Sequence, residues 1–160
     1  MTVTWADLER EAPDLAAIAR DEFARSGMAL VGTLRRDGAP RISNVEPVIA
    51  DGELYLGMMW QSRKVVDLLR DPRLVLRNAV CTNRGDEVEL IIRGHAVARD
   101  DATSREAYLA HSEAAWGSSP FHLFAVAIDS AALIRYGGGQ QYVKVWPQGK
   151  EFSRPTLEPA

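Results

Sequence analysis

The chain has 160 residues, and its 22 acidic against 19 basic side chains give a formal net charge of -3. That length suits one domain, which buries a sufficient hydrophobic core without disulfides. The mildly acidic charge gives no reason to expect nucleic acid or an anionic membrane as a partner, and no apolar run approaches the length of a membrane-spanning helix.

The N-terminal segment, residues 1–26, shows the periodicity of amphipathic helices. Thr4 and Asp7 resemble a capping box, and Pro13 suits the first turn of a further helix. We therefore predict a short helix, a break and a second helix that ends at Ser26-Gly27. The apolar residues that recur at spacings of three and four, and that share one face, are Trp5, Leu8, Ala12, Leu15, Ala19 and Phe23.

After residue 27 the hydrophobic period changes to that of β-strands. Three strands are predicted, joined by tight turns at Arg36-Asp37-Gly38 and Asp51-Gly52. Connections this short allow only antiparallel pairing, so the strands form a meander. Pro47 indicates an edge position or a bulge in the second of them. The predicted strands span residues 28–34, 41–49 and 53–59.

The second half of the chain continues with strands and two further helices. Ser62 is a good N-cap for the first helix, and Thr103 with Glu106 forms a capping box for the other. Gly94 marks a bulge or bend. Because strands dominate and closure removes exposed sheet edges, we predict a closed or partly closed barrel in one domain, residues 1–160. The helix that begins at Thr103 is expected to end near residues 116–117, and the tail, residues 147–160, is expected to be loose. Strands are expected at residues 73–81, 87–98, 121–128 and 141–146.

Cysteine and histidine usage bears on location and on metal binding. Cys81 is the single cysteine, and we interpret it as a small buried hydrophobe in a strand rather than a catalytic thiol. A lone cysteine without a secretory leader pattern indicates a reducing environment, so we expect a cytoplasmic protein. His95, His111 and His122 show no metal-ligand spacing, so no metal site is predicted.

The run from Trp60 to Lys64 carries the clearest chemical signal. It places a hydroxyl (Ser62), a guanidinium (Arg63) and an ammonium at the start of a helix, directly after a strand. A helix N-terminus has unpaired N–H groups and a partial positive charge, so these side chains complete a cradle for phosphate. By itself the run also fits an ordinary N-cap followed by solvated charges.

The strand that begins at Arg41 carries the second signal. Polar side chains inside a central strand of the meander are able to hydrogen-bond the rim of a heterocycle; a strand with one solvated face is the alternative. Alternation puts Arg41, Ser43 and Val45 on one face, and Ile42, Asn44 and Glu46 on the other.

Together these segments resemble a known family. The order GTLRRDGAPRISNV, then DGELYLGMMWQSRKVVDLLRDPRLVL, is similar to the split-barrel flavin-binding family named for pyridoxamine-5′-phosphate oxidase. Its members show a strand, a hairpin, a strand that begins Pro-Arg, a second hairpin, a strand, and then Ser-Arg-Lys at the start of a helix. The resemblance covers residues 25–98. It implies a mainly β fold: a split β-barrel of antiparallel strands, of the Greek-key type, with a few short flanking helices.

The resemblance also implies a function and a site. It implies an FMN-dependent oxidoreductase that acts on a small organic substrate, as a homodimer with the cofactor at the subunit interface. Ser62, Arg63 and Lys64 would then bind the phosphate, with Arg41 reaching the same end. Trp146 is expected beside the flavin or, alternatively, in ordinary packing. The residues implied to line or border the ring system are Ser43, Asn44, Val45, Met58, Met59 and Trp60.

The chain departs from the oxidase itself at two places. Glu46 stands where the oxidase has a lysine that helps to hold the cofactor, and the strand from Val88 to Gly94 lacks the oxidase's polar run. We therefore do not expect oxidation of vitamin B6. Two alternatives stay open: an oxidoreductase that uses the deazaflavin F420 in the same fold, and a flavin-binding protein without catalysis. No side chain is assigned as catalytic, because the flavin ring would carry the chemistry.

Overall fold

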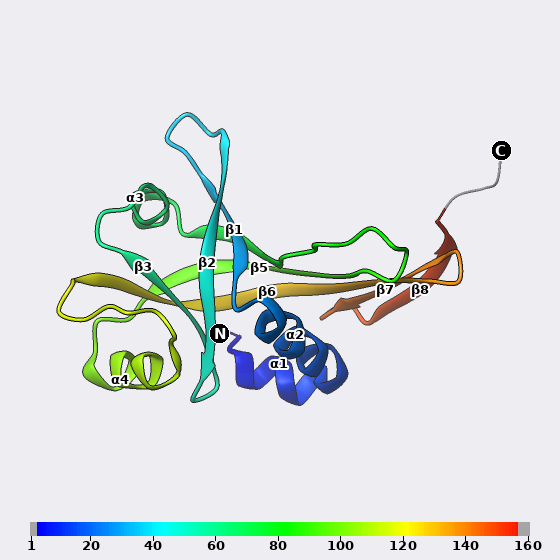
Figure 1. Ribbon diagram of the computed structural model, residues 1–160, viewed down its shortest axis with the longest axis horizontal. Helices are drawn as coiled ribbons and strands as arrows, with labels where there is room; N and C mark the ends of the chain where they lie inside the picture. Colours follow the sequence, from blue (N-terminus) through cyan, green and yellow to red (C-terminus); the bar gives the residue numbers. More distant parts are fainter. Residues whose placement is uncertain (1–2, 157–160) are drawn as a thin grey trace.

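The structure is a computed structural model that describes residues 3–156 (Figure 1). The helices in this part of the chain are α1 (Trp5–Glu11), α2 (Pro13–Ser26), α3 (Arg63–Arg70) and α4 (Ala102–His111). The strands are β1 (Ala29–Leu34), β2 (Pro40–Ala50), β3 (Glu53–Met59), β4 (Arg73–Asn78), β5 (Val88–Ala98), β6 (Phe121–Gly137), β7 (Gln140–Trp146) and β8 (Lys150–Pro155). None of the helices in residues 3–156 is long and apolar enough to cross a membrane.

Six of the strands close into a barrel. Their order is β3-β2-β1-β4-β5-β6, and β6 pairs back to β3. Because β1, β2 and β3 form a meander and β4 returns beside β1 through α3, the spatial order is that of a Greek key. The predicted split barrel of antiparallel strands with short flanking helices is thus confirmed. Figure 1 shows β6 running along much of the molecule and carrying β7 and β8 at the end away from α3 and α4.

β2 changes partner along its length. Residues 40–45 pair with β1, and residues 46–50 pair with β3. Pro47 lies in the second half, opposite Leu56 of β3 and beyond the β1 ladder. Because proline has no N–H to donate, this local edge is where a strand accepts it. The expected edge position of Pro47 is therefore confirmed.

The N-terminal helices form as predicted and cover the barrel. The Thr4 hydroxyl accepts from the Asp7 amide while the Asp7 carboxylate accepts from the Thr4 amide, which is the predicted capping box. Gly27 ends α2 with φ 67°, a left-handed conformation that glycine adopts without steric cost. The apolar faces of α1 and α2 enter the main core, with Trp5, Leu8, Leu15 and Phe23 all buried.

The predicted bulge at Gly94 is confirmed. The register between β5 and β6 shifts between Arg93 and Gly94. A Cβ atom built on Gly94 would lie 2.0 Å from the backbone oxygen of Ala127, so the two strands approach this closely only with glycine here.

Several predictions for the second half are wrong in detail. β4 ends at Asn78, because the Asn78 side chain bonds the Val88 carbonyl and the Leu90 amide. Cys81 therefore lies exposed in the following loop rather than buried in a strand. The cap of α4 is Asp101, which accepts from the Ser104 amide at 2.8 Å, and the helix ends at His111, before Trp116.

A further correction concerns the tail, which was expected to be loose. Residues 150–155 form β8, which pairs along β7 from Val145–Lys150 to Gln140–Pro155. All six side chains of β8 are exposed. Backbone hydrogen bonds to β7, rather than burial of side chains, therefore hold this strand in place. Because no side chain needs to be buried, the sequence of β8 carries no hydrophobic pattern that would have predicted a strand. Residues 157–160 of the expected tail lie outside the described part of the chain.

Gly94→Ala is expected to destabilise the protein by at least about 2 kcal/mol, because the added Cβ meets backbone atoms that cannot move alone. Urea unfolding followed by circular dichroism measures the change. Gly137→Ala on β6 is the matched control, since a Cβ there has no neighbour within 4 Å. Equal stability of the two variants would contradict this account of the bulge.

Candidate functional site

The start of α3 holds a buried hydroxyl that has no partner. β3 ends at Met59, and the chain enters α3 through Gln61, whose φ of 54° is uncommon for a residue other than glycine. Ser62 is the N-cap, yet its side chain makes no capping bond, and its Oγ is buried without a hydrogen-bond partner in residues 3–156. The first-turn amides of α3 and this hydroxyl are therefore all available to an external acceptor.

Two cations follow this hydroxyl directly. Arg63 is exposed, and Lys64 is half-buried with its Nζ donating to the Asn44 carbonyl oxygen at 3.0 Å. Burial lowers the pKa of Lys64, because the charged ammonium loses hydration. An anion bound at the start of α3 would stabilise the charged form of Lys64 by electrostatic attraction. The structure thus brings the three residues of the predicted phosphate cradle to one helix end.

A cavity of about 410 Å³ lies next to this helix end, and we call it the β2–β3 cavity. Its volume falls in the range of small-molecule sites. β2, β3 and α3 supply five of the residues implied by the resemblance: Asn44, Val45, Met58, Met59 and Lys64. The end of α2 and the segment after α4 close the rest of the wall, with Ser26, Gly27, Met28, Glu113, Ala114 and Trp116 among its residues.

The other sequence-implied residues do not line this cavity. Ser62 and Arg63 lie at the start of α3, and Arg41 lines a groove across β1, β2, β4 and β5. Ser43 is partly buried on β2 but is not among the residues that line the cavity. Trp60 lines a neighbouring cavity. Trp146 is buried in the main core, where its Nε1 donates to Glu11 Oε2 at 3.2 Å. A single protomer therefore does not bring Trp146 to the β2–β3 cavity.

Arg41 meets α3 through a buried carboxylate. Its Nε donates to Asp67 Oδ2 at 2.7 Å, and the Thr33 hydroxyl donates to the same oxygen at 2.9 Å. Burial alone would raise the pKa of Asp67, but the hydrogen bonds from Arg41 and Thr33 outweigh it and the pKa is lowered. Asp67 is therefore ionised at neutral pH, and it holds Arg41 against α3.

The carboxylate of Glu46 anchors the segment that follows α4. Its Oε2 accepts from the Ser112 hydroxyl at 2.6 Å and from the Tyr108 hydroxyl at 3.3 Å. Its Oε1 accepts from the Glu113 amide at 2.6 Å. Glu46 thus fixes one wall of the β2–β3 cavity.

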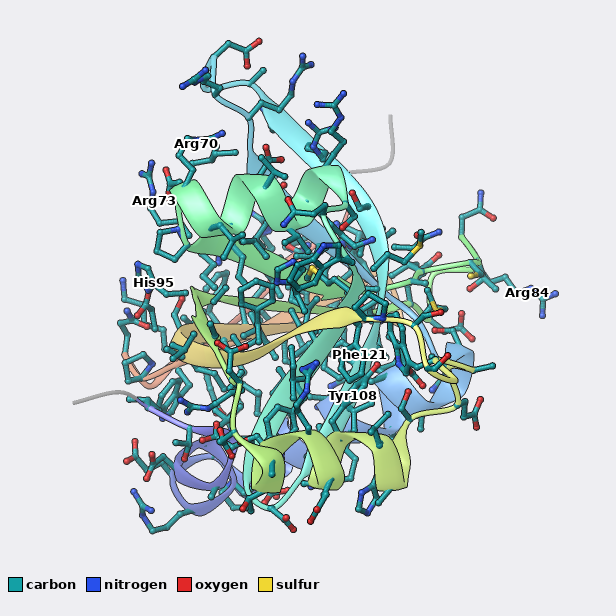
Figure 2. All side chains as sticks on the ribbon, turned by 90° about the vertical axis from the view of Figure 1, so that its left-hand side faces the viewer. Arg70, Arg73, Arg84, His95, Tyr108 and Phe121 are labelled. Carbon is teal, nitrogen blue, oxygen red and sulfur yellow. The ribbon has the colours of Figure 1, made fainter. Side chains whose placement is uncertain are left out.

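Tyr108 fits under the barrel because residue 57 is glycine. A Cβ on Gly57 would lie 2.1 Å from the Tyr108 hydroxyl oxygen. Burial raises the pKa of Tyr108, so the phenol keeps its proton and remains a donor to Glu46. Figure 2 shows Tyr108 rising from α4 toward Phe121. Sequence reasoning missed α4 as part of the site, and the one available signal was a glycine inside a strand.

Comparison with known proteins finds no matching family model and no matching curated protein, but solved structures share the fold. A protein related to general stress protein 26, of the pyridoxinephosphate oxidase family, from Clostridium acetobutylicum gives a TM-score of 0.61 at 15% identity, over 88% of this chain and 93% of that one. A NimC/NimA family protein from the same organism gives 0.62 at 12% identity, over 86% and 96%.

A heme binding protein from Mycobacterium smegmatis gives a TM-score of 0.61 at 16% identity over 87% of this chain, which spans 57% of that protein's length. At identities this low the likeness shows the fold alone. The chain therefore has the split-barrel fold of pyridoxamine-phosphate-oxidase-like proteins, and its ligand is a separate question.

Asp67→Asn is expected to lower stability at neutral pH by about 3 kcal/mol, because it removes the charge partner of Arg41 from a buried position. The pKa of Asp67 is lowered in the folded protein. Its stabilisation is therefore present above the unfolded-state value of about 3.9 and is lost as the pH falls through the folded-state pKa.

Urea unfolding of both proteins at a series of pH values tests this expectation. The stability difference should be largest near pH 7 and shrink below about pH 4. Asp21→Asn, at an exposed position on α2, serves as the control and should cost little at any pH. A difference for Asp67→Asn that does not change with pH would contradict the ionised pair.

Proposed function

We propose that this protein binds FMN, with the phosphate at the start of α3 and the ring system in the β2–β3 cavity, and that it is an oxidoreductase acting on a small organic substrate. The observation that carries this proposal is the buried Ser62 hydroxyl without a partner, placed at a helix N-terminus with two cations beside it. An unpaired buried hydroxyl costs free energy, and a ligand that accepts its hydrogen bond removes that cost.

The phosphate fits the chemistry of this helix end. The first-turn amides and the Ser62 hydroxyl donate, while Arg63 and Lys64 add charge-assisted hydrogen bonds. Lys64 also gains from a phosphate because its pKa is lowered by burial, and an adjacent anion favours its charged form. Arg41 on β2 is held by Asp67, which lies one turn further along α3, and it adds positive potential there.

The ring system would lie on an apolar floor with polar groups at its edge. Val45 and Met58 are buried in the wall of the β2–β3 cavity, while the exposed Asn44 offers an amide to a heterocycle edge. Bound FMN would supply hydride or electron transfer, and the protein's residues orient it and tune it by burial and hydrogen bonds. Glu46 is already engaged by three donors, so it anchors the cavity wall rather than moving a proton.

The structural neighbours support a cofactor in this fold and differ in which one. One is described as a heme binding protein and another as a member of the pyridoxinephosphate oxidase family. Haem iron is held by histidine, cysteine or tyrosine, or by methionine paired with histidine; the described residues that line the β2–β3 cavity include methionines but no histidine, cysteine or tyrosine. The phosphate cradle and this lining both favour a flavin over haem.

The proposal includes a homodimer with the cofactor at the subunit interface. Val66 and Leu69, on the helix that begins at the cradle, are exposed by 43% and 55%, and Ile42 on β2 is exposed by 73%. Exposed apolar side chains mark candidate interaction surfaces, and a two-fold axis would cover them with the same surface of a second copy. Light scattering of the FMN-loaded protein should give twice the mass of one chain; the mass of one chain would contradict the dimer.

F420 is the second candidate, and a basic groove favours it. A groove of about 520 Å³ across β1, β2, β4 and β5 is lined by three arginines, Arg41, Arg73 and Arg93, against one acid, Asp129, which lies 3.0 Å from His95. Figure 2 shows Arg73 on the side of the molecule that carries Arg70 and His95. Arg41 lines the groove and also contacts α3, so a cofactor with a longer anionic tail would extend from the cradle into this groove.

Replacing Arg63 and Lys64 together by alanine is expected to weaken FMN binding by at least about 100-fold, because two hydrogen bonds to a charged group are lost at about 1.5–3 kcal/mol each. Calorimetric titration of the cofactor-free protein measures the affinity. The control removes two charges from exposed side chains that do not line the cavity, in the variant that combines Arg36→Ala with Arg84→Ala, and should bind FMN as the wild type does.

The same titration with F420 separates the two candidates. Arg93→Ala should lower the affinity for F420 and leave the affinity for FMN unchanged, because Arg93 lines the groove and not the cavity. An affinity for FMN that survives loss of both cradle cations would overturn the phosphate assignment. Binding of neither cofactor would overturn the proposed function.

A further inference from the structure

A second cavity adjoins the β2–β3 cavity, and its lining carries no charge. We call it the indole cleft; it measures about 370 Å³. Two indoles and a thioether dominate its surface, and no described residue that lines it is ionisable. The lining residues are Met59, Trp60, Ala115, Trp116, Ser119 and Pro120.

Trp60 presents a supported aromatic surface. Its ring stacks on His122 with centroids 4.2 Å apart and planes 7° from parallel, and His122 in turn stacks on Phe124 at 6.3 Å. Burial lowers the pKa of His122, and its Nε2 is buried without a partner in residues 3–156, so the imidazole is neutral. Trp60 nevertheless remains 55% exposed. One face of the indole is therefore held while the rest of the ring meets solvent.

Trp116, the other indole of the cleft, is held by Tyr108 and Phe121. Its Nε1 donates to the Tyr108 hydroxyl at 3.1 Å, and its ring stacks on Phe121 with centroids 4.7 Å apart. The segment that carries Trp116 is anchored by Glu46 through Ser112. Both indoles are thus oriented before any ligand arrives, and a preorganised surface loses little freedom on binding.

The indole cleft and the β2–β3 cavity share part of their walls. Met59 and Trp116 line both of them. A molecule in the indole cleft would therefore lie next to a ring system in the β2–β3 cavity, which is the position that a reacting substrate needs.

We propose that the indole cleft binds the substrate, and that the substrate is a flat, uncharged aromatic molecule of one or two rings. Flat rings stack on indoles, and a thioether makes favourable contacts with aromatic rings. A carboxylate or phosphate on the substrate is disfavoured, because no cation lines the indole cleft to pair with it. This inference rests on the proposed function, since it makes the bound cofactor the reaction partner.

Nuclear magnetic resonance of the full chain labelled at its tryptophan indoles tests the proposal, with 2-naphthol as the probe. The indole resonances of Trp60 and Trp116 should shift, while those of Trp5 and Trp146, buried in the main core, should not. Decahydro-2-naphthol, the saturated analogue, and 2-naphthoate, the charged one, should each bind at least about tenfold more weakly.

Trp60→Leu should weaken 2-naphthol binding about threefold to tenfold, because one stacking surface is lost. The unchanged resonances of Trp5 and Trp146 would show that this variant is folded. Equal binding of the saturated analogue, or unchanged affinity in Trp60→Leu, would overturn the proposal.

Repeating the titration with saturating FMN separates this inference from the proposed function. Retained 2-naphthol binding supports the cleft as a separate subsite, and displacement by FMN overturns it, because the cofactor ring would then occupy the indoles. If FMN does not bind at all while 2-naphthol still shifts Trp60 and Trp116, the proposed function fails and the aromatic site stands.

Discussion

The pairing of β6 with both β3 and β5 is the constraint on which the rest of the structure depends. It closes the barrel, and it sets the end of β3 beside the start of β6, with Met58 opposite His122 and Met59 opposite Phe121. Because the chain leaves β3 at this point, Trp60 comes to lie on His122 and α3 begins directly beyond. The cradle and both cavities therefore share one rim of the barrel, and that rim exists only when the barrel is closed.

A partly buried hydrogen-bond network attaches α4 to this rim. Tyr108 occupies space that Gly57 leaves free, and Glu46 gathers Tyr108, Ser112 and the amide of Glu113 around one carboxylate. A carboxylate satisfied by several donors is stable in a partly buried position. The same network orients Trp116, so a single acidic residue on β2 shapes both the β2–β3 cavity and the indole cleft.

Charge is distributed unevenly along α3. The buried Asp67 in its middle is neutralised by Arg41 and supported by Thr33, whereas neither Arg63 nor Lys64 at its start pairs with a carboxylate within residues 3–156. A helix with positive side chains at its N-terminus works against its own dipole. That unfavourable placement, together with the partnerless Ser62 hydroxyl, is a local conflict that the proposed phosphate would resolve.

The sequence by itself determined the parts that local interactions control. The two N-terminal helices with their capping box, the meander with its tight turns, the glycine bulge and the start of α3 depend on residues a few positions apart, and each follows from periodicity or turn chemistry. Tertiary structure alone decided where Trp146 packs, what Glu46 holds and that residues 150–155 form β8. Glu46 meets Tyr108 across 62 positions and Trp146 meets Glu11 across 135, and no local pattern encodes such contacts, because they arise only when the barrel brings distant strands together.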